Sequence, residues 1–273
     1  MGNIKENPII KKLINVEKKL YYHTLNAKLE KEAAKRKNGW VDSRYTLLQQ
    51  YKDKYNGQRC FIIGMGPSLT EADLNAVKNE YTFGMNSLAL RFEEDPWRPD
   101  FYGVQDIYVY PKLEKALLKE SKRCNKKTTF FVGSTICDKY KVPNNWVKYP
   151  LNAAYHKYEA RIYKYFAKAS DDCYSVVYDG YSITYSLVQL AMYMGFSEIY
   201  LLGTDCSYEK NKQQHFIEYG YQDKNYLTVG ESMIVAYGYL KQLSDKLGVH
   251  IFNATRGGML EVFPRVKLED VLK

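Results

Sequence analysis

The sequence predicts an α/β fold of the Rossmann-like kind, with a mostly parallel sheet covered by helices on both faces. From residue 60 onward, short apolar runs alternate with longer helical patterns, as they do in repeated strand–helix–strand units. The first apolar run, at residues 60–64, ends in a glycine turn that leads into a helix. Most later runs also finish in a small or hydrogen-bonding residue, which is typical of a sheet edge that binds a ligand.

Two regions are expected along the chain: a basic helical extension at residues 1–56 and an α/β domain at residues 57–273. The extension carries a broken amphipathic pattern, which indicates helix. Its apolar positions are Ile9, Ile10, Leu13, Ile14, Val16, Leu20, Leu25 and Leu29. A second, short helix is expected at residues 43–54, before the turn at Asn56 and Gly57.

Strands and helices alternate through the rest of the chain. Strands are expected at residues 60–64, 81–85, 101–104, 128–132, 146–149, 175–178, 199–202 and 249–252. Helices are expected at residues 71–78, 111–119, 156–167, 182–194 and 229–247. Because strands joined through helices run parallel, the carboxyl ends of these strands should meet at one edge of the sheet.

Composition excludes several classes of protein. The 273 residues are 45% hydrophobic and 26% charged, which are ordinary globular values. No apolar run approaches the roughly 20 residues that span a bilayer, and the first residues lack the apolar core of a secretion signal. The five cysteines are odd in number and form no C-x-x-C pair. We therefore expect reduced thiols in a cytoplasm, with neither a disulfide framework nor a structural zinc site.

The net charge of +9 is distributed unevenly, because basic residues far outnumber acidic ones between Lys5 and Lys37. Such helices suit an anionic membrane face, which would place the protein peripherally at the inner membrane. A solvated helix or contact with a second copy, as a homo-oligomer, are the alternatives. The 27 tyrosines are spread through the chain rather than set beside basic residues. Nucleic acid is therefore not an expected partner.

The glycine turn consists of Gly64, Met65, Gly66, Pro67 and Ser68. Glycines let backbone amides approach a phosphate, and a following helix N-terminus favours its negative charge. Thr70 to Asp73 has the form of a capping box. The spacing matches neither the dinucleotide fingerprint nor the phosphate-binding P-loop. The turn predicts a nucleotide or another phosphorylated small molecule, and the alternative is a tight turn without a ligand.

Other strand ends supply further candidate ligand contacts. They are Asn86, Asp106, Gly180, Ser182, Thr184, Gly203 and Thr204. An asparagine offers donors and an acceptor to a base, ribose or sugar hydroxyl. Hydroxyls and free amides at a helix start suit a carboxylate or phosphate. Simple helix capping is the alternative for both Asn86 and Ser182.

Two residues are candidates for proton transfer. Asp205 ends a strongly apolar strand, where a carboxylate acts as a base, holds a hydroxyl or coordinates Mg²⁺. It stands alone rather than in an Asp-x-Asp pair, so no metal site is expected. His215 lies in a long polar loop, and a histidine there is suited to general-base catalysis. His23 and His156 are expected on the surface of charged helices, and His250 in a structural role.

Taken in order, these segments resemble bacterial proteins of domain of unknown function 115. That grouping contains motility-associated proteins and archaeal 6-hydroxymethylpterin diphosphokinase-like proteins. The core is also similar to sialyltransferases of glycosyltransferase family 42. The resemblance is carried by Phe61-Ile-Ile-Gly-Met-Gly-Pro-Ser-Leu69, the Asn86 strand, Pro99 to Asp106, Gly195 to Asp205 with Tyr208, His215-Phe216 and Asn253-Ala-Thr255. These families usually have Asn between the two glycines, where this chain has Met65.

The resemblance implies a GT-A-like variant of the sialyltransferase type that uses a nucleotide-sugar donor, with CMP as the expected nucleotide, and needs no metal. It places the glycine turn at the nucleotide phosphate, Asn86 at nucleotide or sugar, Ser182 at a donor carboxylate and His215 as the base. The expected activity is transfer of a sialic-acid-like or other sugar to a surface glycan or protein. The archaeal relatives imply the alternative, an ATP-dependent diphosphokinase with Mg²⁺ held by Asp106 and Asp205. The third possibility is a non-catalytic nucleotide-binding scaffold.

Overall fold

A computed structural model describes residues 8–123, 128–157, 164–208, 215–220 and 226–273. Seven strands form one sheet in the order β5-β4-β3-β2-β1-β8-β9, and every pair is parallel. The strands are β1 (Arg59–Ile63), β2 (Tyr81–Met85), β3 (Phe101–Val104), β4 (Thr129–Gly133), β5 (Val147–Tyr149), β8 (Glu198–Leu202) and β9 (His250–Asn253). Two short strands, β6 (Leu151–Asn152) and β7 (Val177–Tyr178), form a separate parallel pair. The Rossmann-like α/β prediction is confirmed.

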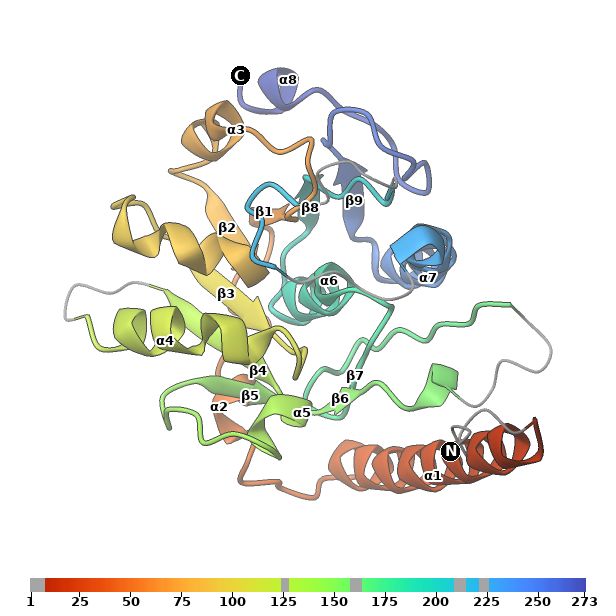
Figure 1. Ribbon diagram of the computed structural model, residues 1–273. Helices are drawn as coiled ribbons and strands as arrows, with labels where there is room; N and C mark the ends of the chain where they lie inside the picture. The colour runs from red at the N-terminus through yellow and green to blue at the C-terminus, as the bar shows by residue number, and fades with distance from the viewer. Residues whose placement is uncertain (1–7, 124–127, 158–163, 209–214, 221–225) are drawn as a thin grey trace.

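Helices cover both faces of the sheet, as Figure 1 shows. In order they are α1 (Pro8–Lys37), α2 (Thr46–Gln49), α3 (Glu71–Ala76), η2 (Asn86–Glu93), α4 (Tyr110–Ser121), α5 (Ser134–Cys137), η3 (Tyr155–Lys157), α6 (Ile183–Tyr193), α7 (Tyr226–Leu247) and α8 (Leu268–Val271). Helices α3 and α4 lie on one side of the sheet, and α6 and α7 lie on the other. The described part of the region expected as a helical extension, residues 1–56, contains α1 and α2.

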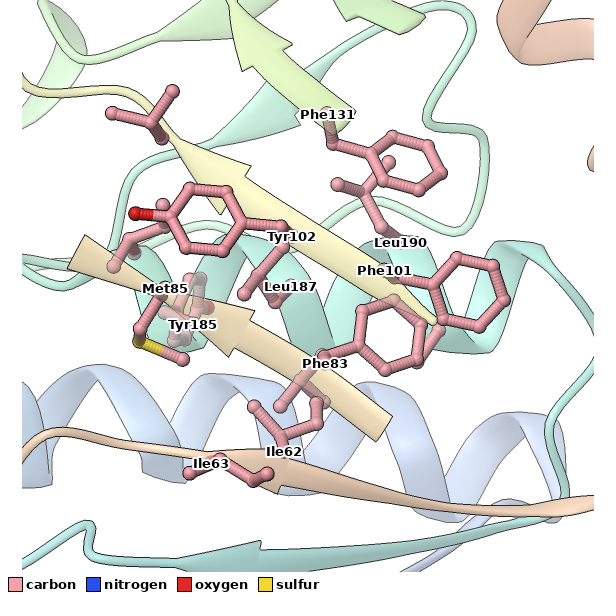
Figure 2. Close-up of a cluster of buried hydrophobic side chains, with 14 of the residues drawn as sticks. Ile62, Ile63, Phe83, Met85, Phe101, Tyr102, Phe131, Tyr185, Leu187 and Leu190 are labelled. Carbon is pink, nitrogen blue, oxygen red and sulfur yellow. The ribbon is translucent and has the colours of Figure 1, made fainter. Parts of the chain in front are cut away.

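The core forms because the strands alternate large side chains between two covered faces. Phe101 and Phe131 lie on the face covered by α6, whereas Tyr102 points to the opposite face, as Figure 2 shows. Every residue of α6 is buried. A methyl group added to Gly103 would lie 2.6 Å from a methyl of Leu187, so glycine lets α6 approach β3 closely. This packing holds the strand ends in fixed positions.

The predicted element boundaries are mostly right to within a few residues, with three corrections. The strand expected at 175–178 is only two residues long and lies outside the main sheet. The helix expected at 156–167 is wrong over its described part, because only the short 3₁₀ turn η3 is helical and residues 164–167 are irregular. The helix expected at 43–54 is shorter than predicted, because only α2 is helical and turns follow it. In each case local propensity gave way to packing against the body.

The C-terminal half of α1 is anchored to the α/β body. The guanidinium of Arg36 is buried, and its Nε donates to the carbonyl of Ser175 at 2.9 Å. Its Nη1 also donates to the carboxylate of Asp42 at 3.2 Å. Glu30 accepts hydrogen bonds from Lys168 at 2.9 Å and from Tyr178 at 3.0 Å. Among the described residues, no helix is both long and apolar enough to cross a membrane.

Candidate functional site

The candidate site lies where the direction of strand addition reverses. The strands β1 to β5 are added outward in one direction, and the chain then returns to place β8 on the other side of β1. In open α/β sheets, ligands bind outside the carboxyl ends of the strands at this switch point. The glycine turn follows β1, and a second turn, Gly203 to Cys206, follows β8. The two predicted segments are thus neighbours in space.

Close contact between these turns explains the two glycines after β1. A Cβ atom on Gly64 or on Gly66 would lie 2.6 Å from the carbonyl oxygen of Gly203. Gly203 itself has a φ of 57°, a conformation that favours glycine. Steric approach of one backbone to another therefore requires glycine here, independently of any ligand.

The backbone amides of the glycine turn already have partners in the protein. The amide of Gly64 donates to the carbonyl of Leu202, and that of Gly66 donates to the carbonyl of Gly203, each at 2.8 Å. The phosphate prediction needs backbone amides that are open to a ligand, and in this structure neither of these two amides is open. A phosphate at this edge would have to contact other groups of the turn.

Asp205 supplies a negative charge to the turn. The Ser68 hydroxyl donates to Oδ2 of Asp205 at 2.8 Å, and the Ser68 amide also bonds to this carboxylate. Burial raises the pKa of Asp205, while the two hydrogen bonds from Ser68 act in the opposite direction. The carboxylate thus lies against the surface that the sequence assigned to a phosphate, and a ligand would compete with it for Ser68.

The segment that carries His215 crosses the same turn. The amide of Phe216 donates to the carbonyl of Met65 at 2.8 Å. The amide of His215 donates to Glu218 at 3.0 Å, and its half-buried ring lies 5.3 Å from the ring of Tyr219. Both predicted proton-transfer residues therefore border the glycine turn. Residues 209–214 of the His215 loop lie outside the described residues.

Three other predicted contacts have structural roles in this conformation. Ser182 caps α6, because its hydroxyl accepts from the amide of Thr184 at 3.2 Å. The hydroxyl of Thr184 is buried and donates to the sulfur of Met85 at 3.3 Å. Gly180 leaves room for the ring of Tyr185, which a Cβ atom would overlap. The capping alternative for Ser182 is confirmed, although its half-buried side chain stays at the sheet edge.

The remaining predicted residues are held by their neighbours. The amide of Thr204 donates to the hydroxyl of Thr255 at 3.0 Å, which fixes the turn after β8. Asp106 accepts from the amide of Tyr108 at 2.6 Å, shortly before α4. Asn86 has a φ of 46° and begins η2, whose N-cap position is Met85, so the capping alternative for Asn86 is wrong.

Of the four described non-glycine residues with positive φ, three follow strands and the fourth, Asp53, does not. Asn86, Tyr181 and Cys206 have φ values of 46°, 67° and 51°, which are unusual outside glycine and more costly for a bulky residue such as Tyr181. Each residue follows directly or closely after a strand, namely β2, β7 or β8. Strained residues of this kind tend to cluster at ligand sites, where the surrounding structure enforces them. The pattern is consistent with a functional edge.

A second polar cluster was not predicted as a site. Gln105 donates to Asp179 at 3.1 Å and accepts from the hydroxyl of Tyr149 at 3.0 Å. Oδ2 of Asp179 lies 3.6 Å from Nε2 of His156, whose ring stacks on Tyr181 at 4.4 Å. The His156 side chain is 6% exposed, so its expected surface position is wrong. The strand-end position of Asp179 was visible in the sequence, but nothing there marked His156 as its neighbour.

Burial moves the pKa values of this cluster in opposite directions. It raises the pKa of Asp179 to about 7 and lowers that of His156 to about 4, because removal from water penalises either charge. Asp179 keeps 16% of its side chain exposed. A carboxyl group with a pKa near neutrality can exchange protons with a ligand. The cluster is therefore a third candidate for proton transfer, beside Asp205 and His215.

Metal ligands do not gather in the part of the chain that the structure covers. Nowhere within the described residues do three or more His, Cys, Asp or Glu side chains lie close enough to hold a metal ion. Asp106 and Asp205, the two candidates for Mg²⁺ in the diphosphokinase alternative, each accept a hydrogen bond from a neighbouring residue instead.

These features define a Rossmann-like α/β protein with a polar, strained sheet edge at its switch point. Residues 38–211 match the family model described as 6-hydroxymethylpterin diphosphokinase MptE-like, and the chain belongs to this family. A solved MAf glycosyltransferase from Magnetospirillum magneticum AMB-1 is similar over 81% of this chain and 37% of its own, with 16% identity and a TM-score of 0.49. The chain thus spans just over a third of that protein's length. No curated protein sequence matches the chain.

Proposed function

We propose that this protein is a glycosyltransferase that moves a sugar from a nucleotide donor, with CMP as the expected nucleotide, to a surface glycan or protein acceptor. One observation carries the proposal. Of the two segments that most resemble sialyltransferases, Phe61 to Leu69 begins within β1, and Gly195 to Asp205 contains β8. These strands pair directly, and the segments are joined at their ends by the Ser68–Asp205 hydrogen bond.

The proposed reaction has simple requirements. An oxygen of the acceptor attacks the anomeric carbon of the donor sugar, and the bond to the nucleotide phosphate breaks with its electron pair. The acceptor hydroxyl loses its proton to a base, for which His215 is the first candidate and Asp205 the second. The hydroxyl of Ser68 is half-buried and donates to Asp205 in this structure. On binding of the donor, this hydroxyl would donate to the nucleotide phosphate instead. No metal takes part in the proposed step.

The family description supports a second candidate, transfer of diphosphate from ATP to a pterin alcohol. In that reaction the alcohol attacks the β-phosphorus of ATP, and AMP leaves. Asp106 and Asp205, after β3 and β8, are the candidate carboxylates to hold the Mg²⁺ that would neutralise the phosphate charge. Each would first have to give up the hydrogen bond that it accepts in this structure.

Nucleotide preference and product identity separate these functions. The melting temperature is measured with CMP, CDP, UDP, GDP and ATP, with and without Mg²⁺, because a ligand of the native state raises it. Mass spectrometry then follows CMP release from a CMP-sugar in EDTA, and AMP release from ATP with 6-hydroxymethylpterin and Mg²⁺. CMP release with sugar transfer supports the glycosyltransferase. AMP release would overturn the glycosyltransferase proposal in favour of the diphosphokinase. Nucleotide binding without turnover of either substrate would favour the non-catalytic scaffold.

A further inference from the structure

Four large apolar side chains are exposed on the N-terminal half of α1. Leu13 is 63% exposed, Val16 57%, Leu20 66% and Tyr21 61%. Leu13, Val16 and Leu20 follow the three- and four-residue spacing of one helix face, and Tyr21 extends that face. We call these four residues the apolar face of α1. A cluster of exposed apolar residues on one surface indicates an interaction site rather than ordinary surface composition.

The apolar face projects from the body while the other end of α1 is fixed. Asn26, Ala33 and Arg36, all in the C-terminal half, are buried against the body. Figure 1 shows α1 along one side of the molecule, with its first turns away from the seven-stranded sheet. Nothing among the described residues covers the apolar face, since its side chains stay more than half exposed.

The charge around this face is positive. Lys12, Lys18 and Lys19 are exposed on the same turns, with Glu17 as the acid among them. Lys157 of η3 adds a cation at the edge, with its Nζ 5.0 Å from the ring centre of Tyr22. Farther along the helix, Glu30 contacts Lys168 of the body at 2.9 Å and Glu32 contacts Arg36 of the same helix at 3.8 Å, so those acids are already paired. The exposed turns at residues 12–21, which we call the projecting turns, therefore keep a net positive charge.

We propose that the N-terminal half of α1 binds the surface of an anionic lipid bilayer. The apolar face enters the boundary between headgroups and acyl chains, and the lysines meet the lipid phosphates, as in amphipathic helices that lie in the interface. Each lysine near an anionic surface strengthens binding roughly fivefold. This inference does not depend on the proposed enzymatic activity.

A second copy of the chain is the less suitable occupant. A stable protein interface takes roughly 20–30 residues on each side. Within the described part of the chain, the exposed stretch around the apolar face covers only the projecting turns, residues 12–21. Two such helices packed together would also bring their lysines close to one another, unless each lysine met Glu17 of the other copy. A lipid surface needs no such matching, because it presents negative charge at every point.

The test is co-sedimentation of the full chain with vesicles. Vesicles of phosphatidylcholine alone are compared with vesicles in which about one lipid in three is anionic phosphatidylglycerol. Two variants are measured: Leu13→Ser with Leu20→Ser, and a triple change of Lys12, Lys18 and Lys19 to Gln. The control changes Lys78, Lys122 and Lys246 to Gln, which removes the same charge from exposed positions elsewhere on the chain. All substituted residues are exposed, so the melting temperatures should match.

We expect the parent chain and the control variant to bind the anionic vesicles and not the neutral ones. The serine variant should bind at least tenfold more weakly, and the glutamine variant roughly a hundredfold more weakly, with a reduced dependence on salt. Equal binding by all variants would overturn the proposal. So would equal binding to neutral vesicles, or sedimentation equilibrium that shows a dimer which the serine variant loses.

Discussion

The carboxylate of Asp179 and the imidazole of His156 lie 3.6 Å apart at the sheet edge, and burial favours the neutral form of each. Between about pH 4 and pH 6.5, both the folded and the unfolded chain bind one proton on this pair. In the unfolded chain the proton is on the histidine, whereas in the folded chain it is on the aspartate. The pair's contribution to unfolding free energy should therefore change little across this range.

Replacing either residue should reveal the pH dependence of the unfolding free energy that the other residue contributes. In His156→Gln the raised pKa of Asp179 remains, so stability should be greatest below pH 4 and fall as the pH rises towards about 7. In Asp179→Asn the lowered pKa of His156 remains, so stability should rise from about pH 4 to pH 6.5. Each slope approaches about 1.4 kcal/mol per pH unit for one proton.

Urea denaturation at several pH values measures these slopes. The double variant should be flat again, which controls for unrelated titrating groups. Parallel pH profiles for the parent chain and both single variants would show that the two groups titrate independently of folding.

Substitution of Gly66 by Ala should destabilise the switch point. The added Cβ atom meets the carbonyl of Gly203 at 2.6 Å and also presses on the carboxylate of Asp205. Crowding of this kind costs about 1–3 kcal/mol. The matched control is Gly238→Ala in α7, where nothing lies within 4 Å of the new methyl group. That change should stabilise the protein by about 0.5–1 kcal/mol. Equal changes in unfolding free energy for the two variants, measured by chemical denaturation, would contradict the steric explanation of the glycine turn.

Substitution of His215 by Ala should lower turnover by about 10²–10⁴-fold if this residue is the base. Nucleotide binding, measured by thermal shift, should stay unchanged. Asp179→Asn is the comparison, because Asp179 is the candidate that burial brings to a pKa of about 7. Loss of turnover in Asp179→Asn with normal turnover in His215→Ala would transfer the role of base to Asp179.

Removal of Arg36 should loosen the basic extension. Its guanidinium joins α1 to the carbonyl of Ser175 and to the carboxylate of Asp42. Arg36→Ala leaves Asp42 buried with fewer partners, and breaking a buried ion pair costs about 3–5 kcal/mol. Because Arg44 also contacts Asp42 at 2.7 Å, the loss should lie at the lower end. Lys35→Ala, at an exposed position one residue earlier, controls for helix propensity. Limited proteolysis near residue 40 should accelerate only in Arg36→Ala.

Much of the fold was predictable because its signals are local. Apolar runs bounded by glycine or polar residues marked the strands of the main sheet, and the capping box of Thr70 and Asp73 is present as expected. The two-residue β7 and the irregular chain after η3 were not predictable in this way. Their conformation depends on packing against α1 and α6, which periodicity does not report.

The sequence by itself determined an α/β chain with parallel strands, a glycine turn after the first strand and polar residues at most strand ends. Only the tertiary structure decided that β8 lies beside β1, which brings Asp205 to Ser68 across 137 residues of chain. It also decided that His156 is buried beside Asp179 rather than exposed on a helix. The physical reason is that propensity acts over a few neighbouring residues, whereas strand order, burial and pKa values depend on contacts between distant segments.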